Sequence, residues 1–209
     1  MIMENKNVEL IIALVFKNIE ERKENYIIGI DGYSCAGKTS ITEQLVKHFK
    51  EKYPVQVFHI DDYITTREQR YSTGYEQWYE LFYLQWNEIY IRDHLFKSLK
   101  SNDVELKLNC YNKEKDVITE RSYKIASRSI VIVEGVYLQR KCWRDFFDYM
   151  IFVDCPRDVR FEREIIRSHH KGDLSQVIEK YKERYWAAEE YYDKTFEPLR
   201  SANLVINNC

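Results

Sequence analysis

The chain has 209 residues and a mass of 25.4 kDa, with 44% hydrophobic and 32% charged residues. This length suffices for one α/β domain with a sizeable core and is too short for two ordinary domains. The 32 basic residues nearly balance the 34 acidic ones, so the formal net charge is −2 and the pI is about 6.3. The bulk charge therefore gives no reason to expect a nucleic acid or an anionic membrane as a partner.

The hydropathy pattern and the cysteine spacing argue against a membrane protein, a disulfide-rich protein and a zinc protein. The longest apolar run, near residues 11–16, is far shorter than the roughly 20 residues that cross a bilayer, and no signal-peptide cleavage pattern accompanies it. The five cysteines are scattered and never spaced as C-x-x-C, which argues against a disulfide framework and a structural zinc site. We expect a cytoplasmic protein without a membrane partner. The sequence leaves open whether the protein forms a homo-oligomer.

Short apolar runs alternate along the chain with longer helical patterns, after an N-terminal helix predicted within residues 1–25. Continuous β-branched or aromatic runs predict strands at residues 26–30, 55–60, 130–133, 149–153 and 203–206. Apolar residues at helical spacing predict helices that include residues 41–49, 78–89 and 174–188. The pattern predicts an α/β fold with a five-stranded parallel sheet, helices on both faces and a small β-hairpin (104–108 with 123–126) at one edge.

A phosphate-binding motif lies between the first predicted strand and the next helix, which is the context that the pattern G-x-x-x-x-G-K-[ST] requires. Backbone N–H groups at the start of such a helix bind phosphate oxygens. The lysine reaches the β- and γ-phosphates of ATP, and the threonine hydroxyl ligates Mg²⁺. A plain glycine turn is the alternative interpretation. The predicted nucleotide-binding residues of this P-loop are Gly32, Ser34, Cys35, Ala36, Gly37, Lys38, Thr39 and Ser40.

Two side chains of this loop carry further expectations. Lys38 is expected to be exposed, so that it contributes charge to the phosphates and little to the core. Cys35 lies near the positive end of a helix, where the pKa of a thiol falls. For Cys35 we favour the alternative of a small residue without a role in catalysis.

Carboxylates follow two predicted strands at the sheet edge where open α/β folds bind ligands. Asp61 and Asp62 follow the second strand, and Glu134 follows the third. Transfer of a phosphoryl group to a hydroxyl needs a carboxylate that accepts the proton and others near Mg²⁺. Asp61 suits the first role, and Glu134 joins Thr39 in the second. Solvated turn or capping residues are the alternative.

Arg160, Arg163 and Arg167 recur on one face of the helix predicted after residue 156. Such a face could neutralise charge on a transferring phosphoryl group. The alternative is a solvated face paired with neighbouring glutamates. Residues 157–173 form the predicted lid region, whose polar end contains a glycine.

Residues 71–90 hold eight aromatic rings, enough to wall a nucleobase pocket by stacking. Simple packing of these rings against the sheet is the more common arrangement and remains open.

In order and spacing, four motifs resemble the uridine kinase family of P-loop kinases over residues 26–206. The motifs are Ile28-Gly29-Ile30-Asp31-Gly32, His59-Ile60-Asp61-Asp62-Tyr63, Val133-Glu134-Gly135-Val136-Tyr137-Leu138 and Asp154-Cys155-Pro156-Arg157-Asp158-Val159-Arg160-Phe161-Glu162-Arg163. The resemblance implies a P-loop NTPase fold and ATP-dependent phosphorylation of a nucleoside 5′-hydroxyl. It implies that Asp61 is the catalytic aspartate, that Glu134 lies near Mg²⁺ and that Arg163 and Arg167 are lid arginines.

The same resemblance assigns Tyr111 to the base, and we group Tyr63 and Arg160 with it as acceptor residues. The family's base-reading histidine is missing from Tyr111-Asn112-Lys113-Glu114-Lys115-Asp116, and the Asp-His-Pro stretch before its ribose-binding aspartate is absent. Relatives with the same Asp-Asp-aromatic motif phosphorylate nicotinamide riboside, pantothenate or ribulose 5-phosphate, so another small hydroxyl acceptor stays open. A regulatory or non-catalytic nucleotide-binding protein is the alternative from a different class.

Overall fold

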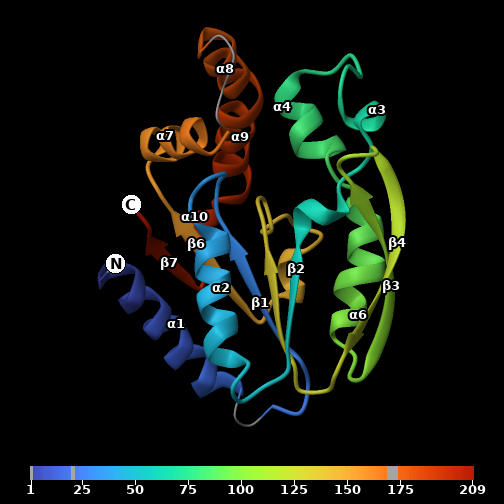
Figure 1. The fold of residues 1–209 in the computed structure, drawn as a ribbon, viewed down its shortest axis with the longest axis vertical. Helices are drawn as coiled ribbons and strands as arrows, with labels where there is room; N and C mark the ends of the chain where they lie inside the picture. Colours follow the sequence, from blue (N-terminus) through green and yellow to red (C-terminus); the bar gives the residue numbers. More distant parts are fainter. Residues whose placement is uncertain (1, 20–21, 169–173) are drawn as a thin grey trace.

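The computed structural model describes residues 2–19, 22–168 and 174–209 and contains a five-stranded sheet flanked by helices (Figure 1). The strand order is β2-β5-β1-β6-β7, and all neighbouring strands are parallel. The prediction of a five-stranded parallel sheet with helices around it is confirmed. The strands are β1 (Tyr26–Asp31), β2 (Val55–His59), β5 (Ile130–Glu134), β6 (Tyr149–Asp154) and β7 (Leu204–Asn207).

The three strands β2, β5 and β1 end level with one another at their carboxyl ends. Glu134, the last residue of β5, pairs in register with Ile30 of β1 and with His59 of β2. The segments that follow these strands therefore leave the sheet side by side. Ligands bind at this edge of open parallel sheets.

Each face of the sheet is covered by its own hydrophobic core. On one face, α1 (Ile2–Ile19) and α2 (Lys38–Phe49) pack on alternate residues of the central strands, such as Ile28 and Ile30 of β1 (Figure 1). On the other face, Ile27 lies in a second core with aromatic residues from the helices between residues 77 and 99 and from α9 (Ala187–Phe196). Burial on both faces explains why these strands are nearly continuous apolar runs.

The helix predicted across residues 78–89 is wrong, because the chain leaves the helix at residues 85–87. The first helix comprises α4 (Gln77–Tyr79) and a π-helical segment (Glu80–Leu84), and the second comprises α5 (Glu88–Tyr90), a π-helical segment (Ile91–Phe96) and α6 (Lys97–Leu99). In the break, the Trp86 indole donates a hydrogen bond to the Ile60 carbonyl over 2.9 Å, and Asn87 caps the second helix through the Tyr90 amide. Trp86 thus stabilises the segment after β2 instead of continuing the helix.

The predicted hairpin exists but forms a separate sheet. Its strands, β3 (Val104–Asn112) and β4 (Val117–Ile125), pair only with each other, so its prediction at the edge of the main sheet is wrong. Leu106, Leu108 and Cys110 of β3 lie in the second core, whereas most of β4 is exposed beside α6 (Figure 1). β3 therefore packs against helical segments and pairs with no strand of the five-stranded sheet.

The N-terminal helix is shorter than predicted, and the predicted lid region is described only in part. The N-terminal helix ends at Ile19, and residues 22–25 are not helical; residues 1 and 20–21 lie outside the described residues. Of the predicted lid, α7 (Arg157–Ser168) is helical, and residues 169–173 lie outside the described residues. None of the described helices combines the length and apolar character needed to cross a membrane.

The remaining helices are a 3₁₀ turn (Ile60–Tyr63), α3 (Arg67–Arg70), a 3₁₀ turn (Arg144–Phe146), α8 (Leu174–Lys180), a π-helical segment (Tyr181–Trp186) and α10 (Pro198–Ser201).

A buried ion pair joins α7 to α9. Two nitrogens of Arg160 donate hydrogen bonds to the two carboxylate oxygens of Glu189 over 2.8 and 2.9 Å, and both side chains are almost fully buried. The third nitrogen, Nε, donates to the Cys155 carbonyl at the end of β6. This bidentate pair fixes the start of α7 relative to α9.

We expect Glu189→Gln to lower the free energy of unfolding by about 3–5 kcal/mol, because it leaves the Arg160 charge buried without a counter-ion. Glu190→Gln is the matched control, since its carboxylate is exposed and only loosely paired with Arg157. The control should change stability by no more than about 0.5 kcal/mol. Urea denaturation of both variants measures the difference, and equal effects would contradict this role of the pair.

Candidate active site

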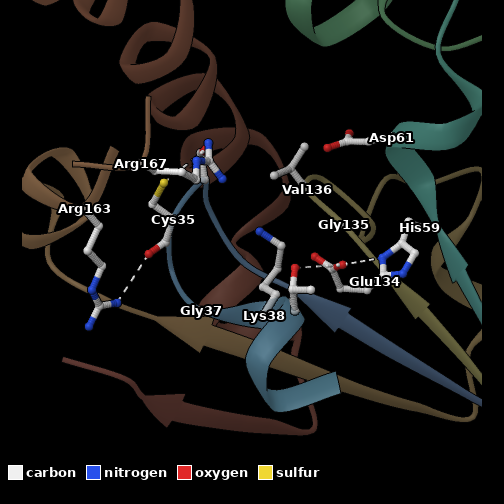
Figure 2. A pocket seen from close by; sticks show the side chains of 12 residues that line it. Cys35, Gly37, Lys38, His59, Asp61, Glu134, Gly135, Val136, Arg163 and Arg167 are labelled. Atoms are coloured by element: carbon white, nitrogen blue, oxygen red, sulfur yellow. Dashed lines mark hydrogen bonds and ion pairs between the residues drawn. The ribbon is translucent and has the colours of Figure 1, made fainter. Parts of the chain in front are cut away.

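A cavity of about 460 Å³ opens at the carboxyl ends of β1, β5 and β2, and we call it the loop cavity (Figure 2). It is enclosed by the predicted P-loop, the ends of β2 and β5, and α7. Figure 2 shows Lys38 and Glu134 facing the same space, with Asp61 on the side opposite Arg163. The lining residues are Ser34, Cys35, Gly37, Lys38, Thr39, His59, Asp61, Glu134, Gly135, Val136, Arg163 and Arg167.

The loop between β1 and α2 adopts the backbone conformation that its glycines permit. Gly32 and Gly37 have φ values of +147° and +92°, and a Cβ on Gly32 would lie 2.5 Å from the Val153 carbonyl oxygen. Gly37 precedes α2, and no side chain caps the helix start. Free N–H groups at such a helix start are suited to an anion.

Two residues far away in the sequence hold this loop from outside. Asn208 donates a hydrogen bond to the Ala36 carbonyl over 2.8 Å. Arg163 Nη1 lies 3.3 Å from the Cys35 carbonyl and 3.1 Å from the Asn208 carbonyl, to both of which it donates. The loop is thus fixed by α7 and by the segment after β7.

The expectation that Lys38 is exposed is wrong, since its exposed fraction is 8%. Its ammonium group donates to the Tyr33 carbonyl over 2.9 Å. Burial lowers the pKa of Lys38, although the charges of Glu134 and Asp61 oppose this effect. Among the described residues no carboxylate is in direct contact with this buried cation, which is therefore suited to bind an added anion.

The expectation of a lowered thiol pKa at Cys35 is also wrong. Burial raises the pKa of this thiol, and the hydrogen bond to Glu164 over 3.0 Å acts in the same direction. Glu164 in turn pairs with Arg167. The thiol is therefore neutral in this environment, which fits a packing role in the loop.

Glu134 lies at the centre of a small polar cluster. His59 Nδ1 is 2.7 Å from its carboxylate, and the Thr39 hydroxyl is 3.4 Å away. Burial by itself would raise the pKa of Glu134, but the His59 hydrogen bond and the Lys38 charge outweigh burial, so the pKa is lowered. The carboxylate also raises the pKa of His59. Glu134 is thus held in its ionised form beside Thr39.

These two oxygen donors fit a magnesium ion. Mg²⁺ prefers hydroxyl, carboxylate, phosphate and water oxygens and is usually held by few protein ligands. Within the described residues, no group of three or more histidine, cysteine and acidic side chains could hold a metal ion. The donor set is therefore suited to an ion that arrives with a nucleotide rather than to a metal bound by protein alone.

A second cavity of about 510 Å³ adjoins the first, and we call it the adjoining cavity. Ser34, Asp61, Val136 and Arg167 line both cavities. Asp61 is accessible from these spaces, yet the surrounding protein removes enough water to raise the pKa of its carboxyl group, and the Lys38 charge opposes that shift. A carboxylate at the junction of two cavities can meet ligands in both.

The adjoining cavity extends between the helices of the second core and the hairpin. Tyr111 lines it, with its hydroxyl donating to Asp116 over 2.9 Å and accepting from Arg70 over 3.2 Å. Aromatic rings of Tyr71, Trp86, Tyr137 and Tyr185 also line it. Part of the aromatic segment therefore walls a cavity, and the rest, such as Phe82, packs in the core.

Some residues predicted for the site lie elsewhere. Tyr63 is buried with its hydroxyl against Tyr123, and Arg160 is bound to Glu189, so neither lines the loop cavity or the adjoining cavity. Within the P-loop, Gly32 and Ala36 are buried, and Ser40 is exposed on the first turn of α2. None of these three lines the loop cavity. Ser34, Gly37 and Thr39 line it.

Other residues of the site were missed from the sequence. His59 belongs to a motif that was recognised, and its place at the end of a predicted strand beside the strand of Glu134 could have marked it as a partner of that carboxylate. Asn208, Arg70 and Arg184 carry no local pattern, because their roles depend on contacts with residues far along the chain. Only the fold brings Arg70 and Arg184 to the adjoining cavity and Asn208 to the P-loop.

The comparisons with known proteins agree with this geometry. The family model described as Phosphoribulokinase / Uridine kinase family matches residues 27–208. A uridine kinase of Streptococcus agalactiae is 28% identical over 194 residues, and one of Lactococcus lactis is 30% identical over 195 residues; each alignment covers 88% of both chains. A solved structure from Bacillus stearothermophilus, titled a "possible uridine kinase", has a TM-score of 0.81 at 34% identity and covers 97% of this chain and 98% of that one.

The phosphate loop, the parallel sheet and these neighbours define a P-loop kinase. The chain belongs to the phosphoribulokinase/uridine kinase family. Kinases of this fold use ATP and typically Mg²⁺, and the P-loop, Thr39 and Glu134 fit that use.

We expect Lys38→Ala to reduce phosphoryl transfer by at least about 10³-fold, because the β- and γ-phosphates lose a desolvated cation. The fold should persist, since Lys38 makes one hydrogen bond and its burial is unfavourable for the charged form. Thermal melting checks the fold, and ATP turnover checks the activity. Unchanged turnover in a folded variant would contradict the assignment of this loop to phosphates.

Proposed function

We propose that this protein transfers the γ-phosphoryl group of ATP to the primary hydroxyl of a nucleoside or another ribose-bearing metabolite. Uridine and cytidine are the first candidates, because the curated relatives are uridine kinases. The observation that carries the proposal is the position of Asp61 at the junction of the two cavities. ATP would occupy the loop cavity, and the acceptor would occupy the adjoining cavity.

In this mechanism, Asp61 orients the acceptor hydroxyl and accepts its proton as the oxygen attacks the γ-phosphorus. Its raised pKa makes it a stronger base than an exposed aspartate, while the Lys38 charge keeps the ionised form accessible. Lys38 stabilises the charge on the phosphates, and Arg167 lines both cavities near the path of transfer. Phosphoryl transfer depends mainly on such positioning and charge stabilisation.

Thr39 and Glu134 would hold Mg²⁺ in this proposal. The ion, when bound, neutralises charge on the phosphates. His59 holds the Glu134 carboxylate toward Thr39 and keeps it ionised. The hydrogen bond from His59 therefore orients this carboxylate for an oxygen-seeking ion.

The aromatic lining of the adjoining cavity supports a flat ring in the acceptor. Tyr71, Trp86 and Tyr111 offer faces or edges for stacking. The hairpin turn carries Lys113 and Asp116 and lacks the base-reading histidine of the family. We therefore expect poor discrimination between uridine and cytidine, because strong discrimination needs buried polar groups that a wrong substrate leaves unpaired.

The test is an ATP-consumption assay with uridine, cytidine, nicotinamide riboside, pantothenate and ribulose 5-phosphate at matched concentration. We expect a ribose-bearing compound to be phosphorylated, with less than about tenfold preference between uridine and cytidine. Turnover of pantothenate or ribulose 5-phosphate without turnover of any nucleoside would contradict a nucleoside acceptor, and the P-loop kinase activity would stand. Binding of ATP without turnover of any acceptor would favour a regulatory nucleotide-binding protein.

We expect Asp61→Asn to lower kcat by about 10²- to 10⁴-fold with little change in ATP affinity, because the lost carboxylate acts on the acceptor hydroxyl. Asp62→Asn is the matched control, since Asp62 lines only the adjoining cavity. Steady-state kinetics with both substrates varied separates the two effects. A large loss in Asp62→Asn with nearly normal Asp61→Asn would move the base by one residue.

A further inference from the structure

Two arginines are buried in one wall of the adjoining cavity. Arg70, at the end of α3, has an exposed fraction of 5%, and Arg184, in the π-helical segment before α9, has one of 1%. Both side chains line the cavity. A guanidinium group stays charged in proteins, so this burial places two permanent positive charges beside the acceptor.

Arg70 has no anionic partner in contact within the described part of the chain. Its Nε donates to the Thr65 carbonyl over 2.9 Å, and its Nη2 donates to the Tyr111 hydroxyl over 3.2 Å. Both acceptors are neutral. Asp116 is reached only through Tyr111, whose hydroxyl donates to it. Burial of a guanidinium against neutral acceptors is unfavourable unless an anion compensates the charge.

Arg184 is only partly satisfied. Its Nη1 donates to the Gln77 carbonyl over 3.2 Å and lies 3.4 Å from a carboxylate oxygen of Glu80. Its Nε and Nη2 are buried and have no hydrogen-bond partner among the described residues. The other carboxylate oxygen of Glu80 accepts two hydrogen bonds, from the amide and the hydroxyl of Thr73. Arg184 thus shares its carboxylate partner with Thr73, and two of its buried nitrogens are left without a partner among the described residues.

The ring of Tyr71 keeps this pair of charges in place. Its centroid lies 4.7 Å from Arg70 Cζ and 4.3 Å from Arg184 Cζ. Cation–π contacts of this kind hold guanidinium groups without neutralising them. Two exposed cations, Arg67 and Lys113, line the same cavity and extend its positive charge toward solvent.

The carboxylates of the adjoining cavity do not balance this charge. Glu189 is bound by Arg160, and Asp61 is the base in the proposed function. Asp62 is the remaining acid among the lining residues. The cations among the lining residues, Arg67, Arg70, Lys113, Arg167 and Arg184, therefore outnumber the acids Asp61, Asp62 and Glu189.

We propose that Arg70 and Arg184 bind an anionic group of the acceptor, so the substrate is a hydroxyl compound that also carries a carboxylate or a phosphate. This inference rests on the proposed function and narrows its acceptor to a compound that carries an anion, which uridine and cytidine lack. Guanidinium forks match the planar geometry of a carboxylate and the oxygens of a phosphate, and both anions would satisfy the buried nitrogens. Arg67 and Lys113 steer the anion into the cavity.

The first experiment measures anion binding directly, with inorganic phosphate as the probe. The protein is first saturated with a non-hydrolysable Mg-ATP analogue, so that phosphate cannot occupy the P-loop, and phosphate is then titrated by calorimetry. We expect Arg70→Gln to weaken phosphate binding at least about tenfold, because the anion loses a buried charged donor. Lys115→Gln is the matched control, since it removes the same charge from the hairpin turn outside both cavities, and it should change binding less than about twofold.

A second variant keeps the test valid if Arg70→Gln fails to fold. The double variant Arg67→Gln and Lys113→Gln alters two exposed side chains and should weaken phosphate binding about threefold or more with unchanged thermal stability. Phosphate that does not bind to the wild-type protein, or that binds equally to every variant, would overturn the anion site.

The second experiment compares acceptors that differ by one anionic group. Uridine against orotidine tests a carboxylate, and ribulose against ribulose 5-phosphate tests a phosphate. We expect the anionic member of one pair to have a kcat/KM at least about tenfold higher, and Arg70→Gln to reduce that preference to about threefold or less. The pair that responds identifies the source of the anion.

The outcomes separate this inference from the proposed function. If neutral acceptors are phosphorylated as well as anionic ones, the anion site is overturned and the kinase function stands. If phosphate binding depends on Arg70 but none of these acceptors is turned over, the anion site stands and the proposed acceptor class fails.

Discussion

The level ending of β2, β5 and β1 is the constraint on which the site depends. In a parallel sheet, register is set by the backbone hydrogen bonds and by burial of both faces, so Glu134 has His59 and Ile30 as fixed neighbours. The P-loop, the segment with Asp61 and the carboxylate of Glu134 leave the sheet at one edge for this reason. The loop cavity lies among these three segments, and the adjoining cavity extends from it toward the hairpin.

Desolvation gives the site its electrostatic character. Burial lowers the pKa of Lys38 and raises the pKa of Asp61, so each group is less stable in its charged form than in water. The negative charge of a polyphosphate would stabilise the charged form of Lys38. The raised pKa of Asp61 would make its carboxylate a better acceptor for a hydroxyl proton. Charges that act inside a low-dielectric cavity are stronger than the same charges in solvent.

Long-range contacts link the loop cavity to the C-terminal part of the chain. Asn208 and Arg163 hold carbonyl groups of the P-loop, while Arg160 ties the start of α7 to Glu189 of α9. A movement of α7 would therefore alter the loop itself. The same α9 element is continuous with the π-helical segment that carries Arg184, so the basic wall of the adjoining cavity and the P-loop share one support.

Local patterns in the sequence determined the five strands, the P-loop and the carboxylates near the ends of β2 and β5, because burial on both faces and a phosphate-binding turn each demand particular residues in a short stretch. The break at residues 85–87, the separate hairpin, the burial of Lys38 and the positions of Tyr63 and Arg160 away from both cavities were decided by the tertiary structure. So were the contacts of Asn208, Arg70 and Arg184. These features depend on which side chain meets which neighbour across the fold, and the free energy of such contacts comes from partners tens of residues away that no local pattern records.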